Sequence, residues 1–134
     1  MQLPAGRRED LVELQTACAQ WMMTVLEFLD TFNGQRPVTG RADLDTVGSR
    51  LDQTLAQVRA AALRCADSAV GVRAVSLVET ADRLGRELSR EHSSRKASML
   101  IQAHRQLHIG YADLMIVLGD ELARLSLSEP RLSA

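Results

Sequence analysis

Residues 97–125 of this 134-residue chain read ASMLIQAHRQLHIGYADLMIVLGDELARL. Apolar residues, joined by one histidine, recur in this stretch at alternating steps of three and four, the spacing that keeps side chains on one stripe of an α-helix. A helical period sustained over this length, with Pro130 beyond its end, predicts a long amphipathic helix. The stripe consists of Ala97, Leu100, His104, Leu107, Tyr111, Leu114, Leu118, Leu122 and Leu125.

Three earlier stretches, residues 11–32, 44–65 and 70–88, repeat the same spacing. Residues that stop or cap helices stand between them. A kinked continuation from the second stretch into the third is the alternative to a separate cap. The expected stops and caps are Asn33-Gly34 and Pro37 after the first stretch, Asp43 or Thr39 before the second, Asp67 or Ser68 before the third, and Ser93 or Ser94 before the fourth.

The connections between these stretches, at 33–40, near 67–70 and near 92–94, are short, which favours neighbouring helices that pack antiparallel. Aromatic residues make up 3% of the chain, so its core must be built from Leu, Val, Ala and Met, as in helix bundles. A long two-stranded coiled coil is disfavoured by the interruption at 33–40. We therefore expect one all-α domain over residues 1–134, folded as an antiparallel four-helix bundle.

Charge and cysteine content exclude several classes of function. The net charge of −1 provides no field that attracts nucleic acid or anionic lipid. The longest run with little charge, residues 106–119, is too short to span a bilayer, and Arg7-Arg8 lacks the apolar stretch of a secretory signal. Cys18 and Cys65 are too few for a disulfide framework and are expected to pack as small apolar groups. We expect a cytoplasmic protein that binds neither nucleic acid nor membrane, and its fifteen arginines against one lysine fit a GC-rich bacterial genome.

His104 and His108 are the residues most suggestive of chemistry, because residues four apart on a helix share a face and would chelate one metal ion. The stretch 108–113, HIGYAD, is similar to the His-Ile-x-x-x-Asp end of hemerythrin-like di-iron bundles. That family also needs histidines on its first two helices, and this chain has none before His92, so the resemblance implies no complete di-iron site. No phosphate loop, nucleophile elbow or Cys-x-x-Cys pair occurs either. We expect no metal, no cofactor and no enzymatic activity, with a ligand- or metal-sensing bundle that uses the His104/His108 region as the alternative function.

The first and the fourth stretch each carry a second apolar stripe beside the first one. Each therefore has more apolar surface than one contact line of a helix bundle requires. An exposed second stripe would be an association site. A broader core, or a tail at 128–134 that covers the stripe, would also account for these apolar residues. The leading interpretation is a non-enzymatic protein–protein interaction module, such as an adaptor, a chaperone-like protein or a regulatory subunit, that self-associates as a homodimer. The candidate interface residues are Val12, Ala19, Met23 and Leu26 in the first stretch, and Ile109, Ala112, Ile116, Ala123 and Leu127 in the fourth.

Overall fold

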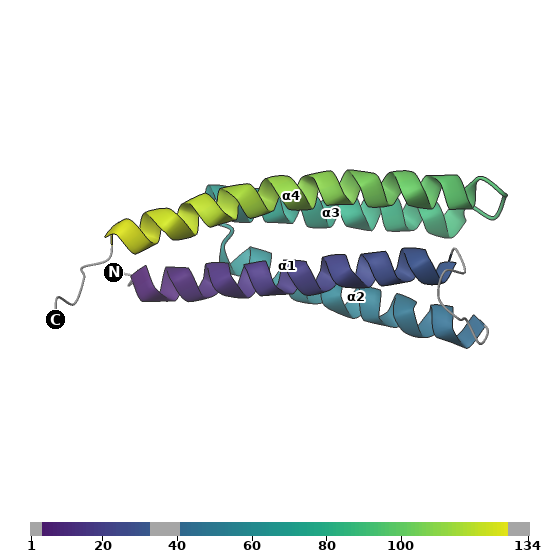
Figure 1. Cartoon of the computed structure of the whole chain (residues 1–134), viewed down its shortest axis with the longest axis horizontal. Coiled ribbons are helices and arrows are strands. Elements are labelled where there is room, and N and C mark those ends of the chain that lie inside the picture. Colours follow the sequence, from purple (N-terminus) through teal and green to yellow (C-terminus); the bar gives the residue numbers. More distant parts are fainter. Residues whose placement is uncertain (1–3, 33–40, 129–134) are drawn as a thin grey trace.

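The computed structural model describes residues 4–32 and 41–128, and within these ranges the chain forms four α-helices and no strand (Figure 1). The helices are α1 (Pro4–Phe32), α2 (Arg41–Arg64), α3 (Ala69–Arg90) and α4 (Lys96–Ser128). Both α1 and α3 pack against α2 and α4, so α1 lies diagonally across the bundle from α3. The start of α1 and the end of α4 lie at the same end of the bundle (Figure 1). The predicted all-helical fold is confirmed.

The core contains most of the residues on the predicted stripes. Leucine and valine side chains there are removed from water, which supplies the main favourable free energy of folding. Ala97 was expected in the stripe of α4, but it is exposed, because it lies in the first turn of that helix, ahead of the packed region. The most deeply buried large side chains are Trp21, Leu11, Leu14, Leu114, Leu118 and Val58, with both cysteines among them.

Two helix ends test the predicted stops. Helix α1 ends at Phe32, immediately before the predicted stop, and the stop residues themselves lie outside the described residues, as does Thr39. Helix α2 begins at Arg41, so the prediction of Asp43 as its N-cap is wrong, and Asp43 lies inside the helix. Sequence does not separate these two positions well, because aspartate is favoured both as a cap and in the first helical turn.

A capped turn separates α2 from α3. The Ser68 side chain accepts a hydrogen bond from the Gly71 backbone N–H at 3.1 Å, and its hydroxyl donates to the Cys65 carbonyl at 2.7 Å. Gly71 permits this approach, because a Cβ at that position would lie 1.7 Å from the Cys65 carbonyl oxygen. Ser68 is therefore the cap, and the kinked continuation of α2 into α3 does not occur.

Before α4, the Ser93 hydroxyl oxygen accepts a hydrogen bond from the Arg95 backbone N–H at 3.1 Å, and Ser93 also donates to the Glu91 carboxylate. Ser93, one of the two predicted capping serines, thus satisfies a backbone donor next to the helix start. None of the helices over residues 4–32 and 41–128 combines the length and the apolar character needed to cross a bilayer.

Arginines of α2 tie this helix to both of its neighbours. Exposed ion pairs of this kind contribute about 0–1 kcal/mol each, so they specify which residues face each other more than they stabilise the fold. The pairs are Arg50–Glu27 and Arg64–Glu13 between α2 and α1, and Arg59–Asp82 between α2 and α3.

Candidate functional site

The large apolar side chains predicted as an interface lie on the outside of α1 and α4. Met23 is 71% exposed and Ile116 is 63% exposed, so these side chains do not belong to a broader core. The other explanation for the second stripe was a covering tail at 128–134, of which residues 129–134 lie outside the described residues. We call the whole set the α1/α4 face: Val12, Met23, Leu26, Ile109, Ile116, Leu127 and Ala123, which are exposed, and Ala19 and Ala112, which are half-buried.

The register between α1 and α4 is given by two contacts near opposite ends of the helices. Near the start of α1, the Arg8 guanidinium donates a hydrogen bond to the Ser126 hydroxyl oxygen. Near the end of α1, Asp30 is close enough to His104 to raise the pKa of that histidine, although burial of the ring outweighs this effect. Residues 14–26 of α1 therefore run beside residues 108–120 of α4, and Figure 1 shows the two helices side by side.

These two stretches are almost free of charge. Helix α1 has no charged residue between Glu13 and Glu27, and α4 has only Asp113 between Arg105 and Asp120. Asp113 is exposed and lines, together with Ile109, a groove that α4 forms with α3. The uncharged parts of α1 and α4 thus coincide on neighbouring helices.

Sequence reasoning missed three further exposed apolar side chains, Ile101, Leu63 and Val72. Ile101 stands eleven residues before Ala112, which is close to three whole turns, so it extends the line of α4 residues toward the start of that helix. That spacing was visible in the sequence. Leu63 and Val72 belong to α2 and α3 and lie apart from the α1/α4 face.

The two histidines of the alternative function lie close together, with ring centroids 6.0 Å apart. His104 is half-buried, and burial of the ring, followed by the nearby His108, lowers its pKa. Within residues 4–32 and 41–128 no group of three or more His, Cys, Asp or Glu side chains could hold a metal ion. Two imidazoles fall short of the three or four protein ligands of a zinc site, and the hemerythrin-like resemblance gains no ligand from the described fold.

Both cysteines are buried free thiols, as expected. Burial raises the pKa of the Cys18 thiol to about 12, and burial together with Asp10 raises the pKa of Cys65. Since the thiolate is the reactive form, neither thiol is suited to nucleophilic or redox chemistry near neutral pH.

A cavity of about 760 Å³ lies between the four helices, toward the end of the bundle where α1 ends and α4 begins. No periodic pattern in the sequence indicated it. His104 from the alternative function is part of its wall. The apolar lining comes from every helix and includes Trp21, Val25, Phe28, Leu51, Leu55, Leu84, Leu88, Leu100 and Leu107.

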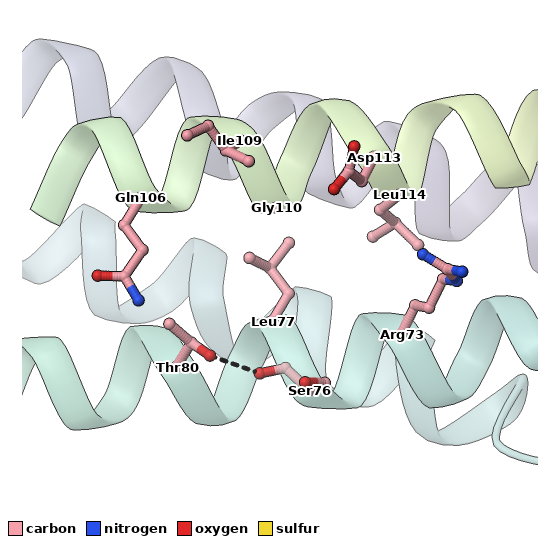
Figure 2. A pocket seen from close by; sticks show the side chains of 9 residues that line it. All are labelled: Arg73, Ser76, Leu77, Thr80, Gln106, Ile109, Gly110, Asp113 and Leu114. Atoms are coloured by element: carbon pink, nitrogen blue, oxygen red, sulfur yellow. Dashed lines mark hydrogen bonds between the residues drawn. The ribbon is translucent and has the colours of Figure 1, made fainter.

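A smaller groove of about 310 Å³ runs between α3 and α4 (Figure 2). Leu77 points from α3 toward Gly110 of α4, where a Cβ would lie 2.9 Å from the Leu77 Cδ1 atom. On the α3 side of the groove, the Thr80 hydroxyl donates to the Ser76 carbonyl at 3.0 Å, the usual bond of a helical threonine to its preceding turn. The groove is therefore a point of close helix packing, with Arg73 and Asp113 at its rim.

The α1/α4 face, the cavity and the groove are the features of the described chain with a bearing on function. Exposed apolar faces associate with other apolar surfaces, and apolar cavities enclose ligands. Neither chemistry needs a nucleophile or a general base. No known protein family, curated protein or solved structure matches this chain.

Proposed function

We propose that the protein is a small non-enzymatic interaction module of the cytoplasm that forms a homodimer through the α1/α4 face. An adaptor, a chaperone-like protein and a regulatory subunit all act through such a surface. One observation carries the proposal: the uncharged stretches of α1 and α4 lie side by side and hold exposed Met23 and Ile116. Charged side chains are costly to remove from water, so a surface without them is the part of the molecule most readily buried.

The proposed arrangement of the helices is antiparallel between all neighbours. Between α1 and α2, Glu13 near the start of one helix pairs with Arg64 at the end of the other, and Glu27 near the end of α1 pairs with Arg50. Arg8 and Ser126 bring the start of α1 to the end of α4 in the same way. These contacts support an up-down-up-down bundle, in which α1 and α4 present one continuous face.

A two-fold axis is the simplest symmetry for this face, because it lets a surface meet its own copy. An axis near Ile116 would bring the two Ile116 side chains together at the centre of the interface. Small residues beside it favour close approach of the two copies, since Ala112 and Ala123 flank Ile116 and Gly119 has no side chain. A Cβ at Gly119 would meet no atom of its own chain within 4 Å, so packing within the monomer gives no reason for a glycine there.

The test is Ile116→Glu, with Val72→Glu as its matched control. The two positions are 63% and 61% exposed, so both changes add one carboxylate at an equally accessible helical site, and only one of them lies on the α1/α4 face. Losing two buried isoleucines and placing two carboxylates together costs the dimer about 3 kcal/mol, or more than a hundredfold in its dissociation constant. Sedimentation or light scattering should report a dimeric wild type, a monomeric Ile116→Glu variant and a dimeric Val72→Glu variant, all with the same helical circular dichroism.

Cross-linking gives a second measurement, which reports directly whether position 116 of one copy meets position 116 of the other. In Ile116→Cys, the introduced thiol is the accessible one, since Cys18 and Cys65 are buried. Mild oxidation should join two copies of this variant, and Val72→Cys should remain uncrosslinked. A wild type that stays monomeric at high concentration, or a Val72→Glu variant that dissociates as readily as Ile116→Glu, would overturn the proposal.

A further inference from the structure

The cavity of about 760 Å³ has the dimensions and the wall of a ligand site. Pockets for small molecules commonly enclose about 300–1,000 Å³ and are lined mainly by apolar side chains with a few polar groups. Here the innermost walls are Trp21, Leu84, Leu100 and Leu107, which are almost completely removed from solvent. An apolar molecule would therefore meet apolar side chains on several sides.

Two glycines keep part of this space open. Gly48 of α2 and Gly85 of α3 both line the cavity, although glycine is among the least favourable residues inside a helix. A Cβ at Gly85 would meet no atom within 4 Å, and a Cβ at Gly48 would reach only ordinary contact, 3.7 Å from Phe28 Cε2. Neither glycine is required by close packing, in contrast to Gly71 and Gly110. Both occupy positions where any side chain would extend toward the cavity or its opening.

Charged residues of both signs line the cavity. Arg86 and Arg90 of α3 and Lys96 of α4 line the cavity, and none of the three has an ion-pair partner among the described residues. Asp45 and Asp52 of α2 also line the cavity. The remaining carboxylate of the lining, Asp82, is engaged by Arg59. Arg86, Arg90 and Lys96 thus supply positive charge without an ion-pair partner to the lining of the cavity, and arginine binds carboxylates with two parallel hydrogen bonds.

We propose that this cavity binds a long-chain carboxylate, with the apolar chain between the four helices and the carboxylate at Arg86, Arg90 and Lys96. His104 lines the interior, and its half-buried ring offers a hydrogen-bonding group along the chain. The site does not use the α1/α4 face. Ligand binding and dimer formation are consequently independent, and the failure of one leaves the other standing.

The experiment uses dodecanoate as the probe, titrated calorimetrically into the full chain at pH 8, where the carboxylate is ionised. Gly85→Leu places a branched side chain at the cavity wall, where its Cβ would meet no atom within 4 Å, and it also replaces an unfavourable helical residue. We expect this variant to melt at a higher temperature than the wild type and to bind dodecanoate at least about tenfold more weakly. Gly85→Ala is the matched control: it gives the same gain in helix formation, adds a single methyl group and should retain binding.

The head group is tested with two further measurements. Dodecanol, which has the same chain and no charge, should bind at least about tenfold more weakly than dodecanoate. In Arg86→Gln/Arg90→Gln that difference should shrink, while the affinity for dodecanol stays the same. No binding of dodecanoate to the wild type, unchanged binding by Gly85→Leu, or equal affinities of the wild type for dodecanoate and dodecanol would overturn the proposal.

Discussion

Gly71→Ala is expected to be among the most damaging single-methyl changes in this protein. A Cβ at this position would lie 1.7 Å from the Cys65 carbonyl oxygen, 2.2 Å from its carbon and 2.8 Å from the Ala66 nitrogen. All three are backbone atoms, so no side-chain rotation relieves the clash, and the start of α3 must move away from the end of α2. That movement breaks the 3.1 Å bond from the Gly71 N–H to Ser68 and disturbs the packing of Val70.

The expected change in the free energy of unfolding of Gly71→Ala is the sum of three contributions. Overpacking in a fixed core costs about 1–3 kcal/mol, and loss of a serine cap adds about 1 kcal/mol. The better helix propensity of alanine returns about 1 kcal/mol. The net loss is about 1–3 kcal/mol in the free energy of unfolding, or about 4–12 °C in the melting temperature for a chain of this length.

Gly85→Ala is the matched control, because it makes the same chemical change in the interior of the same helix. A Cβ at Gly85 meets nothing within 4 Å, so only the propensity remains and the variant should be more stable by about 0.5–1 kcal/mol. Urea denaturation followed by circular dichroism at 222 nm measures both variants. A Gly71→Ala protein as stable as the wild type would refute the close approach of α2 and α3 described above.

Two further outcomes are expected. Ser68→Ala should lower the free energy of unfolding by about 1 kcal/mol, because the α3 cap is lost. Ser89→Ala should leave it nearly unchanged, because the exposed Ser89 hydroxyl bonds only the Gly85 carbonyl of its own helix. Equal losses in the two variants would contradict the capping role of Ser68. Burial is the main cause that lowers the pKa of His104 from 6.5, so the folded state disfavours the protonated imidazole. The neutral His104 therefore contributes to stability above about pH 6.5, and this contribution is lost as the pH falls through the lowered pKa. Unfolding free energies measured from pH 8 to pH 5 should therefore fall less steeply at acid pH in His104→Gln than in the wild type, and identical slopes would argue against a half-buried His104.

The helices were predictable because each depends on its own residues. The steps of three and four that place Leu107, Leu114 and Leu118 on one line are a property of a single stretch, and the structure buries all three. The cap at Ser68 was likewise local, although sequence left Asp67 equally plausible. The ion-pair partner of Asp82 could not be predicted from the sequence. Arg86 stands four residues away on the same helix, yet the Asp82 carboxylate pairs with Arg59 of α2. That choice depends on how far apart two helices lie, which no local spacing encodes.

The two candidate sites, the α1/α4 face and the cavity, also differ in how far the sequence could predict them. The α1/α4 face was visible as a second stripe on each helix, whereas the coincidence of the two uncharged stretches depends on the register between helices and required the structure. The cavity had no periodic signal at all, because its walls are ordinary core residues such as Leu84 and Leu100. Its only trace in the sequence was the pair Gly48 and Gly85, and a glycine inside a helix does not by itself indicate whether it permits close packing, as Gly71 does, or leaves space open.

The uneven distribution of charge would also decide how large the assembly grows. In colloidal terms the molecule has one uncharged strip, formed by residues 14–26 of α1 and, apart from Asp113, residues 106–119 of α4, whereas charged residues are spread along the whole of α2 and α3. Once two copies have joined these strips, the remaining surface carries charged side chains around the separate exposed residues Leu63 and Val72, and it offers a third copy no second uncharged strip of that length. The same geometry that starts association would therefore terminate it at two subunits, and it would leave the mouths of both cavities, lined by Asp52 and Arg90, open to the surrounding water.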